Sequence, residues 1–386
     1  MPWKETDVLN ERVRFVVEAQ RGETSMTALC AAYGVSRKTG YKWLRRYTAS
    51  EGLGELEDRS RRPQRSPGQT PEAVESRVAA LREQYGWGSR KLQRLLGEEG
   101  ISISRGAIDR ILRQRGLIVD TGRARPAVRR FCRATSNELV QMDFKGQYRL
   151  AGAGWCYPLS LLDDHSRYVL ALAALPDQGT ERVQPVVEAC FERYGVPEAM
   201  LVDHGTPWWS STNGHGLTRL SVFLIRQGID LVYSGIAHPQ TQGKVERFHR
   251  TLAEWLEHHG RPRTLEGFAD ALEALRQEYN EVRPHEALAM DRPAAHYVPS
   301  GRAYRPHPLP WEYPAGSDVR RLADNGCLYL EGRYHFVCHA LANQRVCCEA
   351  FGQRILVIYR HMLIRELDVK TGRSRTVLKP YGPTGH

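Results

Sequence analysis

Apolar side chains recur every three or four positions near the start of the chain, beginning with Leu9 and ending with Val17. This spacing predicts an amphipathic helix over residues 7–20. Ser25 stands in a cap position before a second short apolar stretch, and Gly34 stands where that helix would end. The pattern therefore predicts two helices that are connected by a short turn.

A third helix is predicted from Arg37 to Tyr47, after a serine in the cap position. Tyr41 and Leu44 are expected to face inward on it. The outward positions are cationic, and they are Arg37, Lys38, Lys42, Arg45 and Arg46. Two short helices joined by a glycine turn, the second one cationic, predict a helix-turn-helix unit over residues 1–55 that reads a DNA major groove. A three-helix protein-binding bundle with a solvated basic face would have the same pattern.

Residues 71–117 repeat this organisation. Thr70 and Pro71 form a cap and first-turn pair. They precede a stripe of apolar residues at helical spacing, which consists of Val74, Val78, Leu81 and Tyr85. Ser89 and Ser104 are expected to cap two further helices, and the last one carries outward arginines, namely Arg105, Arg110, Arg113 and Arg115. A second helix-turn-helix unit implies a long DNA site that is read in two places.

Two arginine-rich joints separate the predicted units. Residues 56–70 contain two prolines and a group of arginines, which are Arg59, Arg61, Arg62 and Arg65. Residues 118–134 form the second joint. Such segments are extended and do not build a core. As a hypothesis, the first joint follows phosphates or a minor groove, as basic arms do. The alternative for both joints is a plain soluble linker.

From Glu138 the pattern changes to a period of two and then alternates between strands and helices. Strands are predicted at residues 140–144, 157–162, 167–174, 199–202 and 229–233, the first three as a meander. Helices are predicted at residues 181–194, 217–227 and 243–258. The first strand carries Asp143 on its polar side. This order of elements predicts a mixed α/β sheet in a domain over residues 135–300.

Short β-like runs separated by glycines follow a proline-rich stretch in residues 301–386. They lie at residues 327–330, 334–337, 345–349, 355–359 and 363–367. Their spacing predicts a small antiparallel barrel, which would bind DNA or another protein. The fold class predicted for the chain is therefore multidomain: α-helical helix-turn-helix units, an α/β core and a small C-terminal β-barrel.

Charge is distributed unevenly along the chain, whose 386 residues carry a net charge of +11. Residues 1–130 have 26 basic and 16 acidic side chains, residues 131–300 have 16 and 21, and residues 301–386 have 13 and 7. A basic, acidic, basic order suits a nucleic-acid partner. The eight cysteines include no C-x-x-C pair, and no apolar run approaches the ~18 residues of a membrane span. We therefore expect a reducing compartment and no membrane.

Three carboxylates occupy informative positions in the acidic middle of the chain. Asp143 lies within the first strand, Asp203 follows a buried strand, and Glu246 lies in the first turn of the long helix. Carboxylates from two strands and a facing helix can share two Mg²⁺ ions for in-line attack at phosphate. Taken singly, a strand-end aspartate is more often a turn former, and a helical glutamate is often only solvated. The motifs around these residues therefore decide between the two interpretations.

The stretch Asp163-Asp164-His165-Ser166-Arg167 is the main competing cluster. It has the residue types of a separate metal site. Because it falls between two predicted strands, the sequence favours a turn in which an aspartate accepts backbone amides. In the same way, His258-His259 is interpreted as a helix end, and Cys347-Cys348 as core and edge positions of one strand.

Several stretches resemble motifs of one enzyme family. The run HPQTQGKVERFHRTL, residues 238–252, closely resembles the helix motif of bacterial insertion-sequence transposases in the DDE, or retroviral-integrase, superfamily. Residues 201–208 (LVDHGTPW) resemble the second-aspartate motif of that family, and residues 140–146 (VQMDFKG) the first. Residues 280–288 (NEVRPHEAL) are similar to the segment that closes the catalytic domain. The resemblance covers essentially the whole chain.

The resemblance implies an RNase H-like core that cleaves the 3′ ends of a transposon at its terminal inverted repeats and joins them to target DNA. Asp143, Asp203 and Glu246 become the catalytic, metal-binding triad for two Mg²⁺ ions, with Mn²⁺ as a substitute. Lys244, Arg247 and Arg250 become DNA contacts, although a solvated helix face explains the two arginines equally well. Double-stranded DNA is the implied partner, bound by a homo-oligomer of at least two chains. The implied location is the bacterial cytoplasm, at the nucleoid.

Two features depart from the family pattern. The family usually has asparagine after the second aspartate, where this chain has His204, and the neighbours of metal ligands orient those ligands. The interval between Asp203 and Glu246 is lengthened by a loop over residues 209–216. Two other functions stay open at this point. One is a DNA-binding regulator, such as a catalytically inactive transposase derivative, and the other is a non-integrating RNase H-like nuclease.

Overall fold

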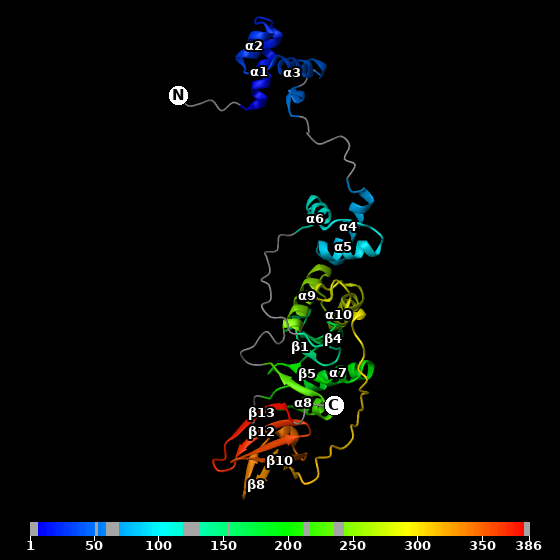
Figure 1. The fold of residues 1–386 in the computed structure, drawn as a ribbon, viewed down its shortest axis with the longest axis vertical. Helices are drawn as coiled ribbons and strands as arrows, with labels where there is room; N and C mark the ends of the chain where they lie inside the picture. The colour runs from blue at the N-terminus through cyan, green and yellow to red at the C-terminus, as the bar shows by residue number, and fades with distance from the viewer. Residues whose placement is uncertain are drawn as a thin grey trace. The chain divides into compact units, whose positions relative to one another are not determined.

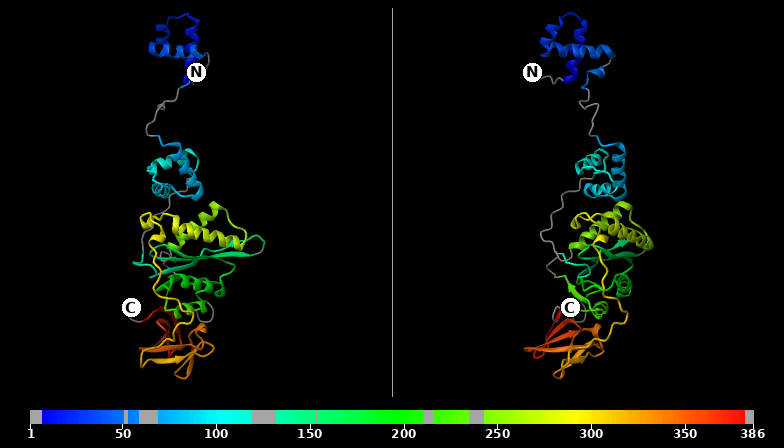
Figure 2. Two further views of the ribbon diagram at one scale, coloured as in Figure 1. Left: turned by 90° about the vertical axis from the view of Figure 1, so that its right-hand side faces the viewer. Right: turned by 45° about the vertical axis from the view of Figure 1, so that its right-hand side comes forward.

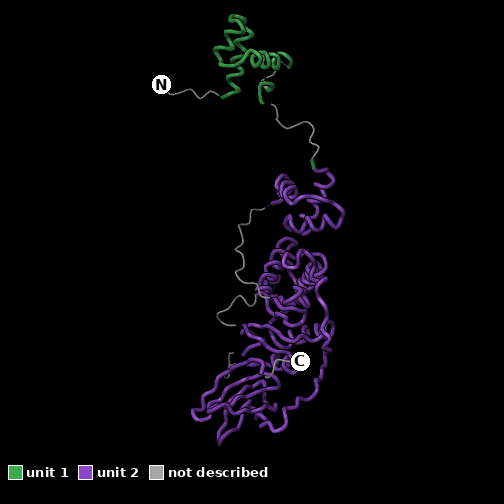
Figure 3. The backbone as a smooth tube through the Cα atoms, viewed as in Figure 1, with its two compact units in different colours: residues 1–69 green, residues 70–386 purple. Residues whose placement is uncertain are grey.

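The computed structural model describes residues 7–50, 53–58, 69–118, 132–152, 154–210, 216–234 and 243–381. The chain forms two compact units, residues 1–69 and 70–386 (Figure 1, Figure 3). The larger unit contains a helical group, a central α/β domain and a strand-rich C-terminal region. Most of both predicted joints, including Arg59, Arg61 and Arg62, lies outside the described residues.

The first unit is helical. It consists of α1 (Val8–Arg21), α2 (Met26–Ala32), α3 (Arg37–Ser50) and the 3₁₀ helix η1 (Leu53–Leu56). Phe15, Cys30 and Trp43 from the three α-helices pack into one core. The cap prediction for Ser25 is confirmed, because its hydroxyl accepts a hydrogen bond from the amide of Ala28 at 3.3 Å. The three predicted helices are therefore present.

The inward face of α3 agrees with the prediction in part, because Leu44 packs against the core as predicted but Tyr41 does not. Tyr41 is 48% exposed, so its predicted inward position is wrong. Trp43 is buried instead, and Gly40 lies so close to the other helices that a Cβ atom would stand 2.5 Å from Cys30 Sγ and 2.8 Å from Phe15. The glycine thus lets α3 pack closely, and this orientation leaves Tyr41 at the surface.

The helical group at the start of the second unit consists of α4 (Glu72–Tyr85), α5 (Ser89–Glu98) and α6 (Arg105–Gln114). Two predicted caps are displaced by one residue. Pro71 rather than Thr70 is the N-cap of α4, and Gly88 rather than Ser89 is the N-cap of α5. The extended backbone ends one residue later than predicted at α4 and one residue earlier than predicted at α5. Ser104 caps α6 as predicted, with its hydroxyl 3.2 Å from a first-turn amide nitrogen.

The central domain is built on a six-stranded sheet. Its strands are β1 (Val140–Phe144), β2 (Tyr148–Arg149), β3 (Trp155–Asp163), β4 (Val169–Leu175), β5 (Ala199–Val202) and β6 (Asp230–Tyr233). The order is β2-β3-β1-β5-β6, and β4 pairs with β3. Strands β1, β3 and β4 form the predicted antiparallel meander, whereas β5 and β6 run parallel to β1. The mixed sheet expected from the sequence is therefore confirmed.

Helices cover both faces of this sheet (Figure 2). Helices α7 (Thr180–Tyr194) and α8 (Arg219–Arg226) pack on one face, and α9 (Gly243–His259) and α10 (Leu265–Gln277) pack on the other. The side of β1 that carries Gln141 is therefore covered, and this residue is only 1% exposed. The expected polar face of β1 is an interior face. None of the helices within the described ranges is both long and apolar enough to cross a bilayer.

Short turns lead away from α10. They are η3 (Glu278–Val282), which is a π-helical turn, η4 (Glu286–Leu288) and η5 (Pro293–Ala295). Ion pairs connect this segment with α5: Arg90 lies 3.3 Å from Glu286, and Arg94 lies 3.4 Å from Asp291. His258, at the end of α9, lies 2.7 Å from a carbonyl oxygen of α4. The interpretation of His258-His259 as a helix end is confirmed.

The C-terminal region is rich in strands. Its elements are β7 (Asp318–Arg321), β8 (Cys327–Leu330), β9 (Arg333–Phe336), η6 (His339–Leu341), β10 (Arg345–Phe351), β11 (Arg354–Tyr359), β12 (Met362–Asp368) and β13 (Ser374–Pro380). One sheet has the order β13-β12-β11-β10-β7, and β8 pairs with β9. Among the described residues no pairing joins β13 to β7, so the predicted closed barrel is not confirmed. Both of these edge strands are largely polar, which explains why alternation did not predict them.

The core of the C-terminal region continues into the central domain. Leu322, Val346 and Ile364 belong to the same buried cluster as Leu217 and Leu220. The five-stranded sheet also has a second buried side, because the adjacent Cys347 and Cys348 of β10 are both buried in different clusters. The expected edge position for one of these two cysteines is therefore wrong.

Leu256 of α9 provides a test of the described core, since it is fully buried between the sheet and α10. Leu256→Ala should lower the free energy of unfolding of the central domain by about 2–5 kcal/mol, because the lost methyl groups leave a cavity. Denaturant unfolding of the full chain measures the loss. The adjacent Glu257→Ala is the control, since Glu257 is exposed and should change stability by about 0.5 kcal/mol or less. Equal effects of the two variants would contradict the packing of α9.

Candidate active site

Two aspartates reach the same edge of the central sheet from neighbouring strands. Asp143 is the fourth residue of β1, and Asp203 directly follows the last residue of β5. The strands are parallel, and Gln141 pairs with Leu201. Continuing this register by two residues places Asp143 beside Asp203. The parallel pairing therefore brings two carboxylates to one place.

Glu246 approaches from the helix layer that covers β1. It lies in the first turn of α9, and its side chain is exposed. The next residue toward the helix start, Val245, donates its amide hydrogen to Oε1 of Gln141 at 3.2 Å. This bond ties the beginning of α9 to β1. The three carboxylates thus come from two strands and a facing helix.

The negative charges of the other two carboxylates act on Asp143, which is half-buried. The pKa of Asp143 is raised to about 7, first because the side chain is buried and then because Asp203 and Glu246 are negatively charged. A hydrogen bond from the amide of Phe144 and the positive charge of Lys145 act in the opposite direction. The site therefore concentrates negative charge at the place where a cation would lower the energy of the ionised form.

The donor set fits a hard cation in its chemistry. All three residues are carboxylates, which are ligands preferred by Mg²⁺ and Mn²⁺. The repulsion at Asp143 is the kind that a bound cation relieves. In the described parts of the chain, however, no three His, Cys, Asp or Glu side chains are gathered closely enough to hold an ion. The metal site stays a prediction.

Asp203 is held by two donors from its own loop. Its Oδ1 accepts hydrogen bonds from the amide of Gly205 at 2.8 Å and from the indole nitrogen of Trp208. Trp208 is 1% exposed, and its ring stacks on Phe144 with 5.6 Å between centroids. Sequence reasoning did not single out Trp208, although it stands in the same motif as Asp203. The signal available in the sequence was a tryptophan, whose indole N–H can donate a hydrogen bond, five residues after Asp203.

His204 contacts aromatic rings. Its ring lies 4.6 Å from that of Trp209 and 5.4 Å from that of Tyr233, between centroids. Gly205 and Trp208, rather than His204, are the donors that the structure gives to Asp203. The orienting role predicted for His204 stays a prediction.

A buried histidine stands beside Asp143. His249 Nδ1 lies 3.8 Å from Oδ2 of Asp143, and its Nε2 lies 3.0 Å from Oγ of Ser160. Burial and the positive charge of Lys145 lower the pKa of His249 to about 3, so the ring is neutral near pH 7. Its contact with Asp143 is therefore polar rather than ionic. The sequence hides this pair, because Ser160 lies in an apolar strand 89 residues before His249.

The competing cluster forms a turn, as predicted. Asp163 accepts the amides of Asn137 and Ser166, each at 2.8 Å. Asp164 accepts the amide of Arg133 at 2.8 Å. Both aspartates are fully buried, and their oxygens are occupied by protein donors. This arrangement stabilises the turn and does not resemble an open metal site.

The basic residues of α9 differ in their surroundings. Arg247 and Arg250 are exposed. The side chain of Lys244 is only 15% exposed, and its Nζ lies 2.5 Å from Oδ2 of Asp164. Contact with DNA stays a prediction for all three residues. The ammonium of Lys244 is already engaged inside the protein.

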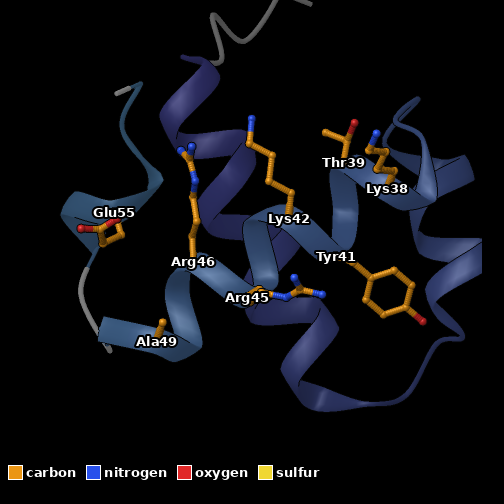
Figure 4. Close-up of a pocket in the computed structure, with 8 residues that line it drawn as sticks. All are labelled: Lys38, Thr39, Tyr41, Lys42, Arg45, Arg46, Ala49 and Glu55. Carbon is orange, nitrogen blue, oxygen red and sulfur yellow. The ribbon is translucent and has the colours of Figure 1, made fainter. Parts of the chain in front are cut away.

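In the first unit, a groove of about 880 Å³ runs along α3 (Figure 4). It is lined by Lys38, Thr39, Tyr41, Lys42, Arg45, Arg46, Ala49 and Glu55. Lys42 and Arg46 each lie 4.8 Å from the centre of the Trp43 ring, which holds part of the cationic face in place. Arg37 is also exposed. On α6, the residues Arg105, Arg110 and Arg113 are exposed. The structure thus presents both predicted cationic helix faces, and their contacts with DNA stay predictions.

Comparison with protein families places these parts in a known context. A Helix-turn-helix domain matches residues 11–64, a Homeodomain-like domain matches residues 39–112, and an Integrase core domain matches residues 227–293. These matches show that the chain is similar to helix-turn-helix domains in its first part and to an integrase core in its middle part. The integrase match includes Glu246 and the whole of α9.

The individual relatives of this chain are distant, and the chain spans about an eighth of the length of the curated relative that it matches. The Gag-Pol polyprotein of baboon endogenous virus (strain M7) is 25% identical over 215 residues, which are 54% of this chain and 12% of the polyprotein. The catalytic core of BIV integrase has 21% identity and a TM-score of 0.32, and covers 41% of this chain and 92% of its own. The HTLV-2 core in complex with magnesium has 14% identity and a TM-score of 0.34, and covers 42% and 99%. A simian T-cell lymphotropic virus intasome in complex with PP2A regulatory subunit B56 gamma has 10% identity and a TM-score of 0.39, and covers 79% and 96%.

The electrostatic coupling within the site is testable in the metal-free protein. Asp203→Asn should lower the pKa of Asp143 from about 7, because one neighbouring negative charge is removed. Glu246→Gln should lower it by less, since its charge contributes less. NMR of the carboxyl carbons measures both shifts. Asp177→Asn is the control, because Asp177 is exposed and pairs with Arg182.

The raised pKa of Asp143 also determines whether the stability of the metal-free protein rises or falls with pH. A carboxyl whose pKa is raised by folding favours the folded state when it is protonated, so metal-free protein should lose stability as the pH rises from about 4 to about 7. Asp203→Asn should reduce this loss. A pKa of Asp143 that does not respond to Asp203→Asn would show that the two carboxylates are not neighbours.

Proposed function

We propose that this protein cleaves the 3′ ends of a transposable element and joins them to target DNA, with Asp143, Asp203 and Glu246 as the catalytic residues. One observation carries the proposal. The parallel register of β1 and β5 brings Asp143 beside Asp203, and the hydrogen bond from Val245 to Gln141 holds the first turn of α9, which carries Glu246, against β1. Convergent carboxylates on an integrase-type core favour phosphoryl transfer over the other functions considered for this chain.

The chemistry assigned to the residues follows from their surroundings. The three carboxylates would hold two Mg²⁺ ions, or Mn²⁺ as a substitute, and the bound ions would activate the attacking oxygen and stabilise the leaving oxygen. Gly205 and Trp208 fix the orientation of Asp203 by hydrogen bonds. The attacking groups are water in the first reaction and the freed 3′-hydroxyl in the second. No serine or tyrosine of the chain is assigned a nucleophilic role.

Recognition of the DNA ends is assigned to the two helix-turn-helix units. The exposed cations of α3 and α6 would contact double-stranded DNA at the terminal inverted repeats, where phosphate contacts supply affinity and base contacts supply selectivity. Two ends must be joined together, so at least two chains are proposed to assemble on the DNA. The basic C-terminal region would add DNA or assembly contacts. The proposed location is the bacterial nucleoid.

A DNA-binding regulator, derived from an inactive transposase, is the second candidate. One observation favours it: His204, which directly follows Asp203, lies among aromatic rings and is not among the donors that the described residues give to Asp203. A regulator would use the cationic faces of α3 and α6 without any chemistry at Asp143.

A strand-transfer assay separates these candidates. Purified protein is incubated with Mg²⁺, labelled DNA that carries the inverted repeats of the element, and a target plasmid. We expect joined products that disappear in Asp203→Asn and in Glu246→Gln, by at least 100-fold, because each variant removes a metal-binding carboxylate. Binding of the repeats by both variants should persist. Tight binding of the repeats by wild-type protein without any joined product would support the regulator instead.

Binding of DNA by α3 is tested separately. Lys42→Ala combined with Arg45→Ala should lower the affinity for the repeats on the order of tenfold and make it less dependent on salt, because two cationic contacts are lost. Fluorescence anisotropy at several salt concentrations measures both effects. Arg14→Ala combined with Arg21→Ala is the matched control, since it also removes two positive charges from exposed residues of the same unit, both on α1. Equal losses in the two proteins would point to net charge rather than to the α3 face.

A further inference from the structure

Asp164 is a fully buried carboxylate with partners on three separate segments. Its Oδ2 lies 2.5 Å from Nζ of Lys244 and 2.8 Å from the amide nitrogen of Arg133. Its Oδ1 accepts a hydrogen bond from Nε2 of Gln141 at 2.8 Å. A second bond runs from Lys244 Nζ to the carbonyl oxygen of Asp164 at 2.9 Å. A buried carboxylate is strongly destabilised when a partner is removed, so this set of contacts holds as a unit.

Gln141 uses both ends of its side-chain amide. The NH₂ group donates to Asp164, and Oε1 accepts the amide hydrogen of Val245 at 3.2 Å. The donor and the acceptor that face it fix the orientation of this amide. The amide of Val245 belongs to the first turn of α9, where backbone donors have no partner within the helix. Gln141 therefore caps α9 from the neighbouring strand.

These contacts stand next to the proposed catalytic residues on both segments. Gln141 precedes Asp143 by two positions in β1, so both residues lie on the same side of the strand. Lys244 and Val245 directly precede Glu246 in α9. An α-helix turns by about 100° per residue, so a slip of one residue at this point would turn Glu246 away from Asp143. The position of Glu246 thus depends on how the first turn of α9 is held.

We infer that Gln141, Asp164 and Lys244 form a buried polar clamp that positions Glu246 relative to Asp143. The inference rests on the proposed function, and it names three positioning residues for that reaction. It assigns a role to the Asp163–Arg167 turn, which supplies Asp164, the carboxylate of the clamp. It also assigns Lys244 to the interior of the protein instead of to the DNA.

Gln141→Met is the first test, since methionine keeps a similar length but loses both hydrogen bonds. In metal-free protein we expect faster amide hydrogen exchange at Val245 and its neighbours in the first turn of α9. At saturating DNA, the rate of strand transfer should fall at least tenfold, as is typical when a partner that orients metal ligands is lost. The dissociation constant for the repeats should stay within twofold. Gln184→Met is the control, because Gln184 is bonded to Glu188 within α7, away from this site.

Lys244 separates the clamp from a DNA contact. Lys244→Met leaves Asp164 buried without its cation, so it should slow strand transfer at least tenfold with little change in DNA affinity. Adding Asp164→Asn removes the buried negative charge that has lost its partner. The double variant should therefore transfer strands at least threefold faster than Lys244→Met alone. A DNA contact would behave differently: Lys244→Met would weaken DNA binding, reduce its salt dependence by about one contact, and gain nothing from Asp164→Asn.

The outcomes are distinct. Unchanged exchange and an unchanged rate in Gln141→Met would overturn the clamp, and so would a loss of DNA affinity in Lys244→Met that Asp164→Asn does not repair. If Gln141→Met fails to fold, as judged by thermal unfolding, the Lys244 variants decide. If wild-type protein yields no joined product, the proposed function fails, but exchange at Val245 and DNA affinity still test the clamp on their own.

Discussion

The parallel pairing of β1 with β5 is the constraint on which the site depends. The pairing of Gln141 with Leu201 sets the register that brings Asp143 and Asp203 to one edge. Because side chains alternate between the faces of a strand, a slip of one residue would send one carboxylate to the opposite face. Buried apolar clusters on both sides of the sheet oppose such a slip. The packing of the two helix layers thus holds the carboxylates close together, although their negative charges repel one another.

Buried polar groups also help to fix the positions of the carboxylates, in addition to the apolar layers. His249 is neutral and lies between Ser160 and Asp143, while Trp208 reaches Asp203 from its own loop. Each of these contacts restricts a carboxylate without adding a full positive charge next to it. A site built in this way keeps its negative potential, which attracts cations, and still gives its side chains defined positions.

Sequence periodicity predicted most elements because helix and strand patterns are local properties. The α3 helix and the inward position of Leu44 were predicted, but the buried positions of Gly40 and Trp43 were not, since they depend on contacts with other helices. The buried position of Gln141 and the pairing of Ser160 with His249 depend on α9 covering β1, which no local pattern records. Edge strands β7 and β13 were missed because polar strands lack an alternating signal. The catalytic carboxylates were proposed from motifs, and their neighbours became visible only in three dimensions.

The cluster that joins Leu217 and Leu220 with Leu322, Val346 and Ile364 has a consequence for how this protein can change over time. The proline-rich stretch near residue 306 looks like a boundary between domains, yet the apolar interior crosses it. If the C-terminal region were exchanged with that of a distant relative, the new region would have to match the shape of the apolar surface beside α8. Otherwise an apolar cavity would remain at the junction. Recombination at this boundary is therefore constrained by packing, and the two regions are expected to be inherited as one piece.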